Sequence, residues 1–91
     1  MRVIRASLSG PCDDPDREGA LALVSDLIWA HTPAVHGLEH LRTRAADDGV
    51  HVYLFLRAAS EAAALTQARA ILDGARVPLR AHGYRTAGPY P

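Results

Sequence analysis

The chain of 91 residues contains no lysine, no asparagine and only one cysteine, Cys12. A single cysteine cannot form a disulfide within the chain, so a small domain held together by disulfides is excluded. The Lys+Arg total of 10 is therefore all arginine, and 10 acidic side chains balance it to a formal net charge of zero. This balance argues against a protein that binds nucleic acid through its overall charge.

Long apolar segments are also missing. The sequence has no run of about 18 consecutive apolar residues, the length that crosses a membrane. Its first residues lack the apolar stretch of a signal peptide as well. We therefore expect a soluble, cytoplasmic protein without membrane contact.

Large side chains are scarce. Apolar residues make up 48% of the chain, but 17 of them are alanine, and only five residues are aromatic. A chain this short with few large apolar side chains forms one small core, which predicts one domain and favours self-association. The alanine and arginine content, with lysine and asparagine missing, is typical of a GC-rich bacterial genome. Arginine enrichment is therefore weak evidence for phosphate recognition.

The spacing of apolar residues predicts six elements of secondary structure. Alternating residues predict strands, and apolar residues three and four positions apart predict helices. Asp13 or Asp14 and then Pro15 suit the start of the first helix, and Ser60 suits the start of the second. The expected ranges are a strand at 2–8, a helix from 13 or 14 to 30–32, strands at 38–46 and 50–57, a helix from 60 to near 74, and a strand at 78–86.

A tight turn is expected between the second and third strands. Asp48-Gly49 is typical of a two-residue type I′ turn, which needs a positive φ angle at both central residues. This turn places Arg44 opposite Tyr53. It also places Arg42 opposite Phe55, so that two arginine–aromatic pairs form across the strands. The apolar positions of both strands then share one side, which supports the register.

The aliphatic residues keep one alternation in all four predicted strands, as a single covering layer of helices requires. In the last strand, Leu79 and Ala81 are expected to face the core. Arg80, His82 and Tyr84 are expected to face away from it. The order of elements predicts an α+β fold, a ferredoxin-like βαββαβ sandwich in which two helices cover one face of a four-stranded antiparallel sheet. This domain would span 1–86, and 87–91 would form a flexible tail.

The uncovered face of the predicted sheet gathers aromatic and basic side chains. Such a surface is typical of the centre of a protein interface, where tyrosine and arginine are enriched. We therefore expect a non-enzymatic binding domain, a homodimer that uses this face for a protein partner encoded by a neighbouring gene or for a small ligand. The candidate contact residues are Arg42, Arg44, His51, Tyr53, Phe55, Arg57, His82 and Tyr84.

Three other interpretations stay open. The basic side chains would merely shield two aromatic side chains if the face is solvated. A small enzyme of the dimeric αβ-barrel kind would use His51, His82 or Tyr84 to transfer protons in a cavity between subunits. Single-stranded nucleic acid would stack on Tyr53 and Phe55, whose spacing matches the third strand of RNA-recognition sheets. The first strand offers no aromatic side chain, however, which argues against nucleic acid.

Neither a metal site nor a cofactor site is predicted. The five histidines stand at positions 31, 36, 40, 51 and 82, and their spacing is not typical of zinc or iron ligands. His31 lies on the apolar stripe of the first helix, where a histidine is more often a hydrogen-bonded core residue than a ligand. Cys12 precedes that helix, but the acidic residues beside it favour the neutral thiol. We therefore assign no catalytic residue, no metal and no cofactor.

Overall fold

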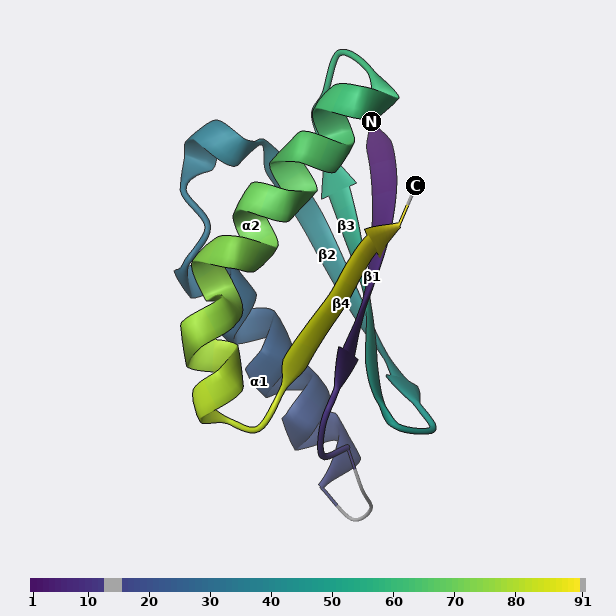
Figure 1. Ribbon diagram of the computed structural model, residues 1–91, viewed down its shortest axis with the longest axis vertical. Helices are drawn as coiled ribbons and strands as arrows, with labels where there is room; N and C mark the ends of the chain where they lie inside the picture. Colours follow the sequence, from purple (N-terminus) through teal and green to yellow (C-terminus); the bar gives the residue numbers. More distant parts are fainter. Residues whose placement is uncertain (13–15, 91) are drawn as a thin grey trace.

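The computed structural model in Figure 1 describes residues 1–12 and 16–90. In chain order its elements are β1 (Arg2–Ser9), α1 (Arg17–Ala30), the short 3-10 helix η1 (Ala34–His36), β2 (Leu38–Ala46), β3 (Gly49–Leu56), α2 (Glu61–Ala81) and β4 (Arg85–Tyr90). The strands form one four-stranded antiparallel sheet in the order β2-β3-β1-β4. The predicted α+β class, with a four-stranded antiparallel sheet and two main helices, is confirmed.

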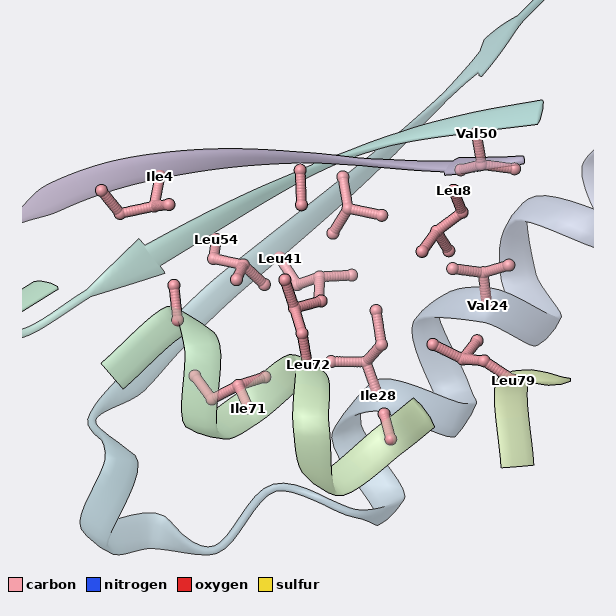
Figure 2. Close-up of a cluster of buried hydrophobic side chains, with 14 of the residues drawn as sticks. Ile4, Leu8, Val24, Ile28, Leu41, Val50, Leu54, Ile71, Leu72 and Leu79 are labelled. Carbon is pink, nitrogen blue, oxygen red and sulfur yellow. The ribbon is translucent and has the colours of Figure 1, made fainter. Parts of the chain in front are cut away.

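The hydrophobic core lies between the sheet and the helices (Figure 2). Alternate strand residues point into it, among them Ile4, Leu8 and Leu54, which are at most 2% exposed. Helix α1 adds Val24 and Ile28, which are fully buried. Burial of each such large aliphatic side chain contributes about 1.5–3 kcal/mol to folding. The alternation of strand residues therefore decides which face of the sheet is covered.

Helix α2 approaches the sheet with small side chains. Ala64, Ala68 and Ala75 are fully buried on the same helix face as Ile71 and Leu72. Because alanine carries only a methyl group, the backbone of α2 can lie close to the strands it covers. Alanine thus serves the packing of this helix, and a helix that begins after Ser60 is confirmed.

The starts of the two helices differ. Ser60 caps α2 as predicted, because its hydroxyl oxygen accepts a hydrogen bond of 3.0 Å from the backbone N–H of Ala63. Helix α1 begins at Arg17, and Asp16 occupies its N-cap position without a side-chain hydrogen bond. The start predicted at Asp13, Asp14 and Pro15 lies outside the described residues.

No helix in the described part of the chain is long and apolar enough to cross a membrane.

The hairpin between β2 and β3 differs from its prediction by two residues in register. Asp47 and Asp48 form the turn, and Ala46 pairs with Gly49. The predicted type I′ turn is wrong, since neither Gly49 nor any described non-glycine residue has a positive φ angle. A glycine is needed at Gly49 for another reason: a Cβ atom there would overlap the carbonyl oxygen of Leu8 on β1. A shift of two residues still keeps every side chain on its predicted face.

Helix α2 extends through residues predicted to form the last strand. It continues to Ala81 and includes Pro78, whose missing N–H removes one helical hydrogen bond. Leu79 is fully buried because it continues the buried stripe of α2 four residues after Ala75, whereas Ala81 is exposed. The strand predicted at 78–86 is therefore wrong over 78–84, and only its last two residues lie in a strand, β4.

A glycine cap ends α2 and fixes where β4 begins. Gly83 has a φ angle of 90°, and its N–H donates to the carbonyl of Arg80 at 2.9 Å. The N–H of Tyr84 donates to the carbonyl of Leu79, also at 2.9 Å. Together these two bonds form a Schellman motif, which favours glycine at the position of Gly83. Residues 87–90, predicted as part of a flexible tail, follow in β4 and belong to the sheet.

Candidate functional site

One face of the sheet carries no helix. Figure 1 shows α1 and α2 on the same side of the sheet, so that its other side faces away from both. Side chains on that side alternate along each strand with the core residues. We call this surface the open face; it comprises Val3, Arg5 and Ser7 of β1, His40, Arg42 and Arg44 of β2, His51, Tyr53 and Phe55 of β3, and Ala87 and Tyr90 of β4.

A row of alternating tyrosine and arginine crosses the open face. Tyr53 pairs with Arg42 of β2 on one side and with Arg5 of β1 on the other. Arg5 in turn pairs with Tyr90, and its guanidinium carbon lies 5.9 Å from the centre of the Tyr90 ring. A cation over an aromatic ring is attracted by about 0.5–1 kcal/mol at an exposed site. The strand register thus builds a central row of Tyr90, Arg5, Tyr53 and Arg42.

The neighbouring rows differ from each other in character. Phe55 lies between Val3 of β1 and His40 of β2. The rings of His40 and Phe55 are 5.2 Å apart between centroids and inclined at 54°, and Val3 is 49% exposed. On the other side of the central row, His51 pairs with Arg44. One end of the open face, at Phe55, is therefore apolar, and the other end, at Arg44, is basic.

Positive charge on the open face is not balanced. Within the described residues, Arg5, Arg42 and Arg44 have no carboxylate partner, and no open-face residue is Asp or Glu. His40 and His51 add further positive charge when they are protonated. Among the described acidic residues, Glu39 and the turn at 47–48 border the face at the two ends of β2.

Two hollows on the open face share Arg44 and Tyr53. The first has a volume of about 500 Å³ and is lined by Arg42, Thr43, Arg44, Tyr53 and Phe55. The second, of about 510 Å³, reaches the hairpin turn and is lined by Arg5, Arg44, Ala45, Ala46, Asp47, Asp48, His51 and Tyr53. Both are open to solvent, so they suit contact with an extended partner better than enclosure of a small substrate.

The structure brings together the predicted residues Arg42, Arg44, His51, Tyr53 and Phe55. Their pairing is new: Arg42 lies opposite Tyr53 and Arg44 opposite His51, because the register differs by two residues. The predicted pairs of Arg44 with Tyr53 and of Arg42 with Phe55 are therefore wrong.

The predicted contact residue Arg57 lies beyond the end of β3. One of its Nη atoms donates to a carboxylate oxygen of Glu39 at 3.1 Å, and its side chain is 82% exposed. Its positive charge is therefore paired, unlike the charges of Arg5 and Arg42 within the described residues.

His82 and Tyr84 are not on the open face, contrary to prediction. His82 is exposed at the C-terminal end of α2, not in a strand. Tyr84 is only 3% exposed and belongs to the hydrophobic core. Neither side chain shares the open face with His51. Of the three alternative proton-transfer groups, His51 is the one that lies on the open face.

The hydroxyl of Tyr84 anchors the loop after β1. It donates a hydrogen bond to the backbone carbonyl of Pro11. Burial raises the pKa of Tyr84 above its ordinary value of 10.0, and the charges of Cys12 and Asp16 act in the same direction. A Cβ atom at Gly10 would lie 2.6 Å from the Tyr84 ring, so the glycine lets the ring pack closely against this loop. We therefore assign Tyr84 a structural role.

Arg5 and Tyr90 are open-face residues that were not among the predicted contacts. Ser7 pairs with Ala87 but Arg5 pairs with Tyr90, so β4 contains one extra residue between these pairs. Under strict alternation from Ala87, Tyr90 would point toward the core side of the sheet. The extra residue places it on the open face instead. Gly88-Pro89 is the available sequence signal, since glycine and proline within a strand mark a bulge.

Within residues 1–12 and 16–90, no three His, Cys, Asp or Glu side chains gather in a group that could hold a metal ion. Comparison with protein-family models, with curated proteins and with solved structures gave no match to this chain. The functional argument therefore rests on the chemistry of the open face.

Proposed function

We propose that this chain is a binding domain that recognises an acidic protein partner through its open face. The observation that carries the proposal is the row of Tyr90, Arg5, Tyr53 and Arg42, in which neither arginine forms an ion pair with a carboxylate of the described residues. Aromatic side chains supply contact area at an interface, and arginines supply direction. A partner rich in carboxylates would complement both.

Arginine chemistry favours carboxylates in particular. A guanidinium group presents two parallel N–H donors that match the two oxygens of a carboxylate. Hydrogen bonds to charged groups contribute about 1.5–3 kcal/mol each. Arg5, Arg42 and Arg44 can make such bonds without first breaking an ion pair in the described part of the chain. Arg57 would first have to release Glu39.

A second copy of the chain is a less favourable occupant of the same face. A two-fold axis through the face would bring the same arginines of both copies together. No described open-face residue carries a carboxylate to separate them. Like charges placed against each other in an interface cost several kcal/mol. The homodimer expected from the sequence therefore becomes an outcome that the experiment must exclude.

Single-stranded nucleic acid is also less favourable. On β1 the open face offers Val3, Arg5 and Ser7, where a base-stacking sheet would present an aromatic side chain. The carboxylates at the two ends of β2 would repel either kind of acidic partner, so the missing aromatic side chain on β1 is what argues against nucleic acid.

We also propose that the chain has a ferredoxin-like fold. The alternation of strands and helices along the chain and the strand order β2-β3-β1-β4 support it. This class hosts many unrelated functions, so it does not by itself identify the partner. A cytoplasmic location is also proposed, and the free thiol of Cys12 is consistent with it.

Defined acidic peptides test the proposal. The affinity of a labelled peptide that alternates glutamate and tyrosine is measured by fluorescence anisotropy at low salt, beside an all-glutamate peptide and a single-stranded oligonucleotide. We expect Arg5→Gln and Arg42→Gln each to weaken peptide binding about tenfold, which corresponds to ~1.4 kcal/mol. The control variant Arg69→Gln removes an exposed arginine of α2 and should leave the affinity unchanged.

A second comparison separates the aromatic contribution from the charge. Tyr53→Ala should weaken binding of the glutamate–tyrosine peptide more than binding of the all-glutamate peptide. Three results would contradict the proposal: no peptide binding at low salt, equal weakening by Arg69→Gln and Arg42→Gln, or tighter binding of the oligonucleotide. Sedimentation showing a dimer that Tyr53→Ala dissociates would identify a second copy as the occupant instead.

A further inference from the structure

A second basic site lies at the edge of the sheet formed by β4. A hollow of about 490 Å³ is lined there by Arg76, Arg80, Tyr84, Arg85 and Thr86. Arg76 and Arg80 are four residues apart on α2, so they lie one turn apart on the same helix face. Arg85 is the first residue of β4, an edge strand of the sheet. Two separate elements therefore bring three arginines to one hollow.

The charges around the hollow are uncompensated. In the described part of the chain, none of Arg76, Arg80 and Arg85 has a carboxylate partner. Like charges four residues apart on a helix surface repel each other and destabilise the helix. The carbonyl end of α2 attracts the positive charge of Arg80, which lies in the last turn of the helix. Arg85 lies in β4, so this attraction does not account for its charge at the hollow. A bound anion would offset the repulsion among all three arginines.

The backbone beneath the hollow is held in place. The Schellman motif at Gly83 fixes the direction in which the chain leaves α2. Tyr84 follows and is tied to the loop after β1 by its hydrogen bond to Pro11. Arg85 and Thr86 therefore start from an ordered backbone. A site that is ordered before binding loses less conformational entropy when a ligand arrives.

We infer that this hollow binds the phosphate group of a small organic phosphate. A phosphate presents several charged oxygens, which match the converging donors of three arginines, and Thr86 adds a hydroxyl to the lining. The hollow is open to solvent, and its volume of about 490 Å³ leaves room beyond a phosphate ion for the organic part of the ligand. The central row of the open face does not line this hollow, so the inference stands apart from the acidic-partner proposal.

Titration of the full chain with ribose 5-phosphate and with inorganic phosphate tests the inference. Calorimetry gives the affinity, and ¹⁵N amide shifts locate the site. We expect saturable binding of ribose 5-phosphate, with amide shifts centred on Arg80, Arg85 and Thr86. Arg80→Gln and Arg85→Gln should each weaken binding about five- to tenfold, since each removes charged donors to the phosphate. Arg69→Gln, on the same helix but outside the hollow, should leave the affinity unchanged.

The two ligands and a further control separate the outcomes. Tighter binding of ribose 5-phosphate than of inorganic phosphate supports an organic phosphate as the ligand, and equal affinities limit recognition to the phosphate group. Absence of saturable binding, or equal weakening by Arg69→Gln and Arg85→Gln, would overturn the inference. Arg42→Gln should not change phosphate affinity although it weakens peptide binding, so failure of one proposal is distinguishable from failure of the other.

Discussion

Replacement of Gly49 by alanine tests whether close contact between β3 and β1 demands this glycine. The added Cβ atom would overlap the carbonyl oxygen of Leu8 and lie 2.8 Å from its carbonyl carbon and 2.9 Å from the Cα atom of Ser9. These are backbone atoms of a paired strand, so β1 must move away from β3. Gly49 has no positive φ angle, and left-handed strain therefore adds nothing to the cost.

The size of the effect of Gly49→Ala follows from these contacts. Overpacking a close contact costs about 1–3 kcal/mol. Separation of the strands at this end also weakens about two ladder hydrogen bonds, each contributing roughly 0.5–1.5 kcal/mol. We expect the free energy of unfolding to fall by about 3 kcal/mol. For a domain of this size, that change lowers Tm by about 12–24 °C.

Urea unfolding followed by circular dichroism measures the loss in Gly49→Ala. Gly19→Ala is the matched control, because the methyl group added in α1 would meet only the flexible side chain of Asp16. Alanine is favoured over glycine inside a helix by about 0.5–1 kcal/mol, so this control should be at least as stable as the parent. If Gly49→Ala unfolds within about 0.5 kcal/mol of the parent, the strands do not need glycine here and the reasoning fails.

Two further variants test a cap and a buried hydroxyl. Ser60→Ala removes the acceptor for the N–H of Ala63 and should destabilise the protein by about 1 kcal/mol in urea. Tyr84→Phe removes the donor to the Pro11 carbonyl and should cost about 0.5–1.5 kcal/mol. Because burial raises the pKa of Tyr84 above 10.0, its contribution to stability is full below that pH and is lost as pH rises through the raised pKa. Unfolding curves on both sides of pH 10.0 should therefore show a smaller alkaline loss for Tyr84→Phe than for the parent, and equal losses would contradict this assignment.

Alternation along the strands was sufficient to predict the covered face of the sheet. Leu54 lies in the core and Tyr53 on the open face, as predicted, although the hairpin register is shifted by two residues. Burial of one face fixes only whether the register is shifted by an odd or an even number of residues. A shift of two residues therefore does not change which apolar side chains face the core. The role of Gly49 depends on Leu8 of β1, a contact that the local sequence of the hairpin does not encode.

The end of the chain resisted prediction because helix and strand patterns coincide there. An inward Leu79 fits both, and Pro78 usually ends a helix. In the structure Leu79 continues the buried stripe of α2 four residues after Ala75, and this packing against the rest of the fold is a tertiary effect. Gly83 then acts as a helix cap, while the extra residue in β4 brings Tyr90 to the open face. Tyr90, the aromatic end of the central row, was missed because residues 87–91 were expected to form a flexible tail and not part of a strand.

A titration that maps amide shifts tests the acidic-partner proposal most directly. The ¹⁵N-labelled chain is titrated with the glutamate–tyrosine peptide at low and at raised salt. We predict saturable shifts at Arg5, Arg42 and Tyr53 that weaken as salt increases, with no shift at Arg69 on α2. Shifts centred on α1 and α2, or no shift at low salt, would contradict the assignment of the open face as the binding surface.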